Sequence, residues 1–200
     1  MDFLPVPIAA AKAGRIAHDV GLAGLLGGNL YGRLALHPAV AEISDPGERG
    51  KVVNAAWRSY GTVNALSLAV VGAGWIGARN TDIAPSRLSG PERRLAAAGD
   101  VVLGAVAVTG LATAVQGMRF AKSAPDGAVP LTDGDTASSD ATERQARAKK
   151  RLNLLGLATL ATETVLVGVN AAMDQESFRR PPLKRFARRP QSQVQRLLPT

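Results

Sequence analysis

Cysteine is absent from the 200-residue sequence, and its absence excludes several kinds of site. The chain cannot form a disulfide, supply a thiolate nucleophile or bind a metal through sulfur. Histidine is scarce as well, with only His18 and His37 present. These two are 19 positions apart, which is about 28 Å along one helix and too far for both to ligate one metal ion from that helix. We therefore expect no metal site, and no motif in the sequence indicates a cofactor.

Aromatic residues make up only 4% of the chain, and small aliphatic residues carry most of its apolar content. A soluble domain usually builds its core around larger side chains. Helices that associate in lipid depend instead on close backbone approach, which glycine and alanine permit. The hydrophobic fraction of 46% is ordinary for a soluble protein. The class of protein therefore depends on how the apolar residues are distributed.

Charged residues are nearly missing from four long segments, which are 17–36, 61–78, 95–118 and 152–173. Each is close to the roughly 20 residues that cross a bilayer. A helix on the surface of a soluble protein would instead show a polar face along its length. The sequence therefore predicts an all-α integral membrane bundle of four transmembrane helices, a multi-pass protein of the cell membrane.

The connections between these segments are polar. Residues 48–57 are predicted to form a short amphipathic helix before the second span, and Ser89 and Glu92 have the spacing of a capping box before the third. The run 123–140 is rich in Pro, Gly, Ser, Thr and Asp, a composition that favours disorder. Residues 141–151 are expected to extend the fourth helix into water.

The transmembrane domain is expected over residues 1–173, followed by a disordered basic tail over 174–200. The cations of the tail lie among prolines and phenylalanines: Arg179, Arg180, Lys184, Arg185, Arg188 and Arg189. A net charge of +8 raises the question of nucleic acid, but no fold that binds nucleic acid is recognisable, and we expect no such partner. The tail is predicted either to contact anionic lipid headgroups of the bilayer or only to set the topology.

The distribution of Lys and Arg gives the predicted orientation. Four spans put both termini on one side of the membrane, and that side holds slightly more cations, including the dense tail. By the positive-inside rule both termini are predicted to be cytoplasmic. At the N-terminus no cation precedes the first apolar stretch, and Pro5 and Pro7 interrupt it, so a cleavable signal peptide is not expected.

A stripe of glycines follows one face of the first predicted span: Gly21, Gly24, Gly28 and Gly32. Small residues at every fourth position let a neighbouring helix approach closely. The sequence leaves two uses open, packing within the bundle or contact with a second copy of the chain. Packing within the bundle is the interpretation that we favour.

Glu163 is the sharpest single candidate for a functional residue, because it lies near the middle of the fourth span. An ionised carboxylate at that depth costs at least about 2.5 kcal/mol, so such residues often carry protons or cations. The alternative is a hydrogen-bonded glutamate that holds two helices together. The further polar candidates within or near the spans are Asp100, Asp19, Arg33, Asn29 and Asn64.

The chain resembles small four-helix bacterial membrane proteins with an anthrone-oxygenase-like layout. The resemblance rests on the number of spans, the glycine-rich first helix and the amphipathic entry to the second span. The resemblance carries no catalytic residue across. Three functions stay open: a structural or partner-binding bundle, with a membrane partner or a second copy; a small proton-coupled transporter that uses Glu163; and a membrane enzyme acting on an apolar substrate through residues such as His18, Tyr31 and Glu163. We favour the first, without enzymatic activity.

Overall fold

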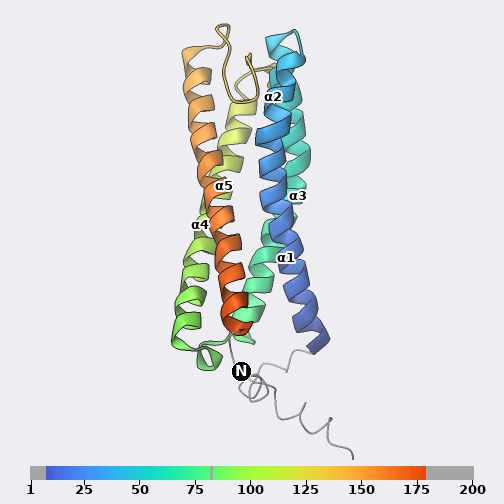
Figure 1. The fold of residues 1–200 in the computed structure, drawn as a ribbon. Helices are drawn as coiled ribbons and strands as arrows, with labels where there is room; N and C mark the ends of the chain where they lie inside the picture. The colour runs from blue at the N-terminus through green and yellow to red at the C-terminus, as the bar shows by residue number, and fades with distance from the viewer. Residues whose placement is uncertain (1–7, 82, 179–200) are drawn as a thin grey trace, which may run out of the picture.

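The computed structural model describes residues 8–81 and 83–178, with side chains from residue 13 onward, and this part of the chain is helical almost throughout. Its long helices are α1 (Ile8–Tyr31), α3 (Pro46–Asn80), α4 (Gly90–Ala121) and α5 (Glu143–Phe178). The short elements are the π-helix η1 (Gly32–Leu36), α2 (His37–Ala39) and three 3₁₀ turns, η2 (Val40–Glu42), η3 (Pro85–Arg87) and η4 (Pro125–Gly127). The long helices lie side by side, and α1 begins at the same end of the molecule at which α5 ends (Figure 1).

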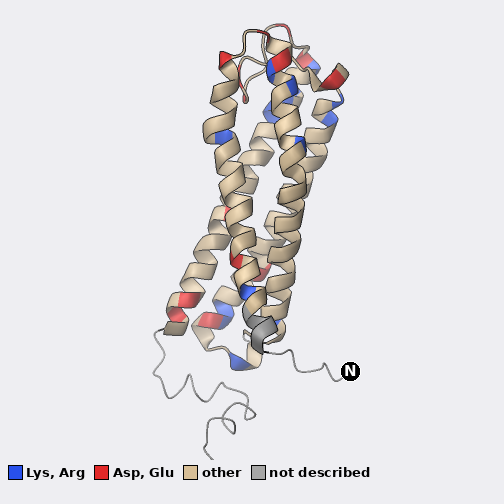
Figure 2. Cartoon of the chain, turned by 90° about the vertical axis from the view of Figure 1, so that its right-hand side faces the viewer, with Lys and Arg blue, Asp and Glu red and all other residues tan. Residues whose placement is uncertain are grey.

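The prediction of a helical membrane protein is confirmed for three helices. By length and composition, α3, α4 and α5 can each cross a membrane. The charged residues gather towards the two ends of the helices, as the charge colouring in Figure 2 shows. Large aliphatic side chains point outward between them: Leu66, Val101, Val108 and Leu111 are each 64% to 73% exposed. Such a surface is unfavourable in water and suits the hydrocarbon core of a bilayer.

The four long helices pack as two pairs, α1 with α3 and α4 with α5. The glycine stripe forms the first pair. A Cβ added at Gly21 would lie 2.9 Å from the carbonyl oxygen of Ser67 on α3, and one at Gly24 would lie 2.6 Å from the Ser67 hydroxyl. At Gly28 and Gly32 it would meet the rings of Tyr60 and Trp57. The stripe is therefore covered by α3 and is not free for a second copy of the chain.

Threonines join the second pair. The hydroxyl groups of Thr109 on α4 and Thr162 on α5 are 3.2 Å apart, and those of Thr113 and Thr159 are 3.0 Å apart. Each hydroxyl has one proton, so in each pair one hydroxyl donates across the interface, and the other accepts and donates to a carbonyl of its own helix. These side chains therefore remain hydrogen-bonded without water.

One apolar cluster is shared by both pairs. It consists of Leu22 and Leu25 on α1, Val71 on α3, Val106 on α4 and Leu166 on α5, all at most 5% exposed. The cluster lies within the predicted spans and leaves little space between the pairs at this depth.

The helix starts follow their capping residues. The Asp45 side chain accepts a hydrogen bond from the backbone N–H of Glu48 at 2.7 Å and starts α3, with Pro46 in its first turn. The amphipathic helix predicted over 48–57 is not separate, because α3 continues from it without a break. The capping box of Ser89 and Glu92 is confirmed at the start of α4.

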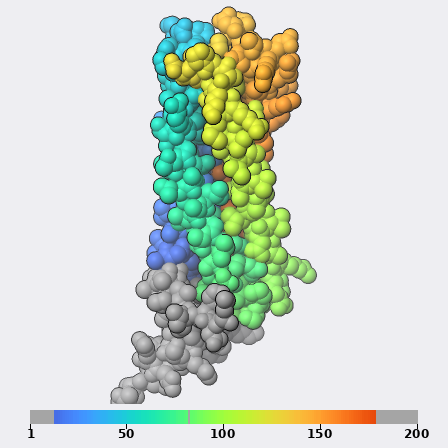
Figure 3. Space-filling model, turned by 180° about the vertical axis from the view of Figure 1, so that it is seen from behind, coloured from blue at the N-terminus to red at the C-terminus, as the bar shows by residue number. Residues whose placement is uncertain are grey.

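The connection 122–142, which we name the cap, differs from the disordered loop that the sequence predicts over 123–140. Val129 and Leu131 are fully buried and pack with Phe120, Val40 and Val53. The cap covers the end of the bundle opposite the start of α1 and the end of α5, and it lies next to the start of α3 (Figure 3). Two apolar residues anchor this polar run because helices distant in the sequence provide the pocket for them.

Side chains of α3 also bind the backbone of the cap. Arg49 donates to the carbonyl of Leu131 at 3.2 Å and to that of Thr132 at 2.9 Å. Asn54 donates to the carbonyl of Gly127 at 2.6 Å. These bonds satisfy carbonyl groups that a loop without secondary structure would otherwise leave to water.

Candidate functional site: a polar seam between α1 and α5

The buried face of α5 carries residues at intervals of four and three. Thr159, Glu163, Leu166 and Asn170 follow this spacing, which places these three polar residues and one leucine on one side of the helix. Glu163 is 1% exposed, although it is ionisable. Asn29 on α1 donates through Nδ2 to both of its carboxylate oxygens, at 2.8 and 2.9 Å. The most buried carboxylate of the bundle therefore has a specific partner on another helix.

Two further polar contacts join α5 to the first helix and its π-helical continuation. The ring of His18 meets the side-chain amide of Asn170 at 2.9 Å, and Arg33 donates to the backbone carbonyl of Asn153 at 3.3 Å. We name these six residues the polar seam: His18, Asn29, Arg33, Asn153, Glu163 and Asn170. The seam joins the two helix pairs, and the apolar cluster of Leu22, Leu25 and Leu166 interrupts it between Asn170 and Glu163.

The ring of His18 lies at one end of the seam. Its Nδ1 lies 2.8 Å from the backbone carbonyl of Val71, which only accepts, so Nδ1 carries a proton. Its Nε2 lies 2.9 Å from the side-chain amide of Asn170. The ring also stacks on Trp75, with centroids 6.1 Å apart. Both ring nitrogens are thus engaged.

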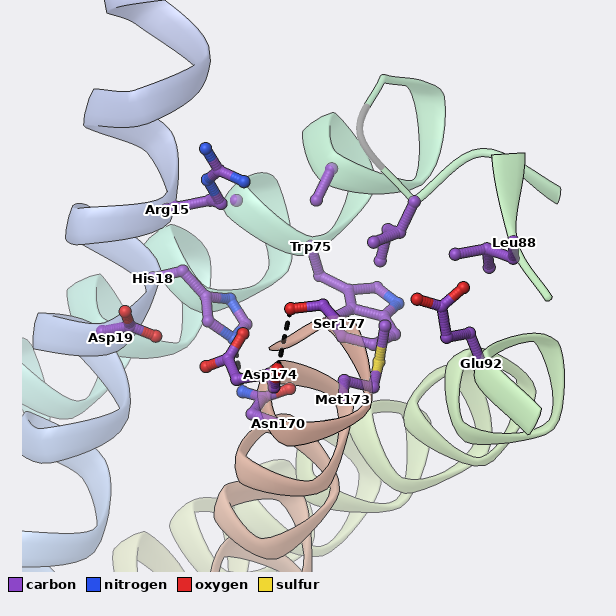
Figure 4. A pocket seen from close by; sticks show the side chains of 13 residues that line it. Arg15, His18, Asp19, Trp75, Leu88, Glu92, Asn170, Met173, Asp174 and Ser177 are labelled. Carbon is purple, nitrogen blue, oxygen red and sulfur yellow. Dashed lines mark hydrogen bonds between the residues drawn. The ribbon is translucent and has the colours of Figure 1, made fainter. Parts of the chain in front are cut away.

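A pocket of about 200 Å³ opens beside His18 at the end of the bundle where the described chain begins and ends. Trp75, Leu88 and Met173 form its apolar walls (Figure 4). Asp19 on α1, Glu92 on α4 and Asp174 on α5 add three carboxylates, and Arg15 adds a cation. Burial and the charge of Asp19 raise the pKa of Asp174, which follows the last residue of the predicted span.

Asp100 belongs to a separate contact between α3 and α4. It accepts from the indole N–H of Trp75 at 2.7 Å and from two nitrogens of Arg79, at 3.1 and 2.9 Å. Asp19 lies instead near Asp174 in the pocket. The two predicted candidates therefore have different neighbours, although both lie towards this end of the bundle.

The structure gives the remaining candidates different settings. Arg33 lies 3.6 Å from Asp135 of the cap in addition to its contact with Asn153. The side-chain oxygen of Asn64 is buried without a hydrogen-bond partner among the described residues. Tyr31 is 68% exposed, and Glu163 is two helical turns from the Asn170 that binds His18. An enzyme that used Tyr31, His18 and Glu163 would require these side chains to lie together. The structure does not bring them together.

Sequence reasoning missed the polar cluster under the cap, which contains His37, Trp57, Asp135 and Lys149. Lys149 is only 3% exposed and lies over the ring of Phe120, 5.7 Å from its centroid. Burial lowers its pKa to about 8. The signal in the sequence was the pair of apolar residues, Val129 and Leu131, inside an otherwise polar run.

The tail cations from Arg179 to Arg189 lie outside the described residues. Within the described part, no three His, Asp or Glu side chains are grouped so as to hold a metal ion. Comparison with known proteins identifies no relative: no family model, curated protein or solved structure matches this chain.

Proposed function

We propose that this protein is a four-span integral membrane protein of the cell membrane that acts as a structural or partner-binding bundle and not as an enzyme. The observation that carries the proposal is the pair of half-buried Asn29 and buried Glu163, in which an intramembrane carboxylate has both oxygens bound by a side chain of another helix. In this proposal Glu163 fixes the position of α5 against α1.

The first helix is proposed as the fourth span. It packs against α3 through its glycines, and its outward side carries apolar residues such as Val20 and Leu34, which are 67% and 71% exposed. Asp19 and Arg33 lie near the ends of the predicted span 17–36, where their side chains can reach the interface. Four spans place both termini on one side, which the excess of cations assigns to the cytoplasm.

A structural role for Glu163 follows from its surroundings. A polar side chain in lipid is unfavourable unless another helix supplies its hydrogen bond, so a matched pair fixes which helices meet and at what register. The side chains of the seam meet in matched pairs of this kind at Asn29 with Glu163 and at His18 with Asn170. A partner protein in the membrane would then bind the outer faces of the bundle, where the large aliphatic side chains are exposed.

The test is a double-mutant cycle on this pair, with the unfolding of the full chain measured in detergent. Glu163→Leu and Asn29→Leu each leave the other side chain without its partner, and we expect each to destabilise by about 1–3 kcal/mol. The double variant removes both groups and should be no less stable than either single variant. Additive losses would contradict a clamp between α1 and α5.

A proton-coupled carrier is the second candidate function, favoured by one observation: the seam that contains Glu163 ends beside the pocket at His18. Glu163→Gln discriminates between the two functions, because the amide keeps an acceptor oxygen for Asn29 but cannot exchange a proton. In vesicles with an imposed pH gradient, the clamp predicts that wild type and Glu163→Gln show the same background proton flux. A wild-type flux that Glu163→Gln abolishes would replace the clamp with the carrier.

A further inference from the structure

One attachment of the cap to the rest of the protein is at His37, which lies at the start of α2. The backbone N–H of Gly134 donates to the carbonyl of His37 at 2.8 Å. The His37 ring, 6% exposed, lies 3.0 Å from the carboxylate of the next residue, Asp135. Arg33 lies 3.6 Å from the Asp135 carboxylate, and the side chain of Asn153 donates to the backbone carbonyl of Asp135. His37 and Asp135 are therefore the centre of the attachment.

The hydrogen bonds of His37 require the neutral ring. Trp57 on α3 points its indole N–H at Nε2 of His37, with 3.0 Å between the nitrogens. An indole nitrogen donates and cannot accept, so Nε2 must hold a free electron pair. The single proton of the neutral ring is then on Nδ1, from which it is donated to Asp135.

Protonation of His37 places a second N–H on Nε2, facing the N–H of Trp57. Two donors then point at each other, and no other orientation of the indole makes its nitrogen an acceptor. The attraction between a charged ring and Asp135 opposes this effect. Burial acts against the charged ring, as do Lys149 on α5 and Arg33 on η1, and together they keep the pKa of His37 below its ordinary value of 6.5.

We propose that the cap is a pH-operated latch on this end of the bundle, closed by neutral His37 and released when His37 is protonated. The released segment contains Gly134 and Asp135, and the buried Leu131 lies three positions before Gly134. This inference concerns regulation and does not depend on which function the bundle has.

The direction of the pH effect follows from proton binding in the two states. In the open state His37 is solvated and titrates near 6.5, whereas in the closed state its pKa is lower. The open state therefore binds more protons as the pH falls below 6.5. For one group the equilibrium between closed and open shifts by at most about tenfold per pH unit.

The absence of native cysteine permits a direct test with single cysteines in the full chain, purified in detergent. Leu131→Cys reports opening, because Leu131 is fully buried in the closed cap. Ser139→Cys, at an exposed position of the same loop, corrects for the effect of pH on thiol reactivity. The measured quantity is the maleimide labelling rate of Leu131→Cys divided by that of Ser139→Cys, at pH 7.5 and 5.5.

We expect this ratio to rise several-fold at pH 5.5, and to stay constant when His37→Gln is added, since glutamine can accept from Trp57 but does not titrate in this range. A second variant, Trp57→Phe, guards against loss of the cap in His37→Gln. It removes the opposing N–H, so protonated His37 keeps its bond to Asp135, and the rise at pH 5.5 should shrink. A ratio that does not change with pH in the wild-type background, or that changes equally in all backgrounds, would overturn the proposal.

Discussion

The two ends of the bundle each contain a buried histidine, and the two differ in the partner at Nε2. His18 meets the amide of Asn170 at the end with the pocket, whereas His37 meets the indole of Trp57 under the cap. An amide group can turn and offer its oxygen, but an indole nitrogen only donates. The partner at Nε2 can therefore reorient at one end of the bundle and cannot at the other. The response of a buried histidine to pH thus depends on what its partner is able to accept.

The largest loss of stability is expected from a substitution that forces the cap away from His37. A Cβ at Gly134 would overlap both the backbone and the ring of His37, so we expect Gly134→Ala to destabilise the protein by about 1–3 kcal/mol. The measurement is thermal unfolding in detergent.

Gly77→Ala is the matched control at the opposite end, because a Cβ there meets nothing within 4 Å. It should leave stability unchanged or raise it by up to about 1 kcal/mol, the helix propensity of alanine over glycine. Equal unfolding temperatures for the two variants would show that the cap does not need its close approach to His37.

Removing the buried charge under the cap should have the next largest effect, in the opposite direction. A pKa lowered from 10.5 to about 8 makes charged Lys149 unfavourable near neutral pH, by about 3 kcal/mol at about 1.4 kcal/mol per unit. Its contact with Phe120 returns about 0.5–2 kcal/mol. We therefore expect Lys149→Met to stabilise the protein by about 1–2 kcal/mol at pH 7.

The pH dependence sharpens this second prediction. Since the folded state holds the Lys149 proton less tightly, wild-type stability should rise between pH 8 and pH 10.5. Lys149→Met should lose that rise, and Lys150→Met, at the exposed neighbouring position, should keep it. Unfolding temperatures at pH 7 and pH 9.5 measure both, and a rise that survives in Lys149→Met would contradict the assignment.

Asn170→Leu tests the adaptable end. It removes the side chain that binds Nε2 of His18, but the adjoining pocket lets water take its place. We expect a loss of about 1 kcal/mol, as for a replaceable hydrogen bond. Asn170→Gln keeps the side-chain amide and serves as the control. A loss as large as that of Gly134→Ala would mean that this end is as tightly constrained as the cap.

The smallest effect is expected at the ion pair of Arg79 and Asp100, whose side chains are 24% and 44% exposed. Solvent screens such a pair, so Arg79→Gln should cost less than about 1 kcal/mol, and the difference from wild type should shrink in high salt. Unfolding in low and high salt measures this. A large loss that salt does not reduce would place the pair in a less polar environment.

Periodicity and capping predicted the helices well, because both act over a few neighbouring residues. The prediction of apolar helices is confirmed for α3, α4 and α5, as is the capping box at Ser89. The helix predicted over 48–57 runs into the second span as one helix, because nothing in the sequence after it ends a helix before Asn80. Composition alone also misjudged the cap, because it counts polar residues and does not weigh where Val129 and Leu131 fall.

The sequence alone determined which segments are apolar, that thiol chemistry is excluded and that Glu163 lies in the middle of an apolar segment. Only the tertiary structure decided which side chains meet: Asn29 with Glu163, His18 with Asn170, and His37 with both Trp57 and Asp135. The reason is that helix formation follows from local backbone hydrogen bonding, whereas these partners are 20 to 152 positions apart. Their meeting depends on how the two helix pairs pack, which local periodicity does not encode.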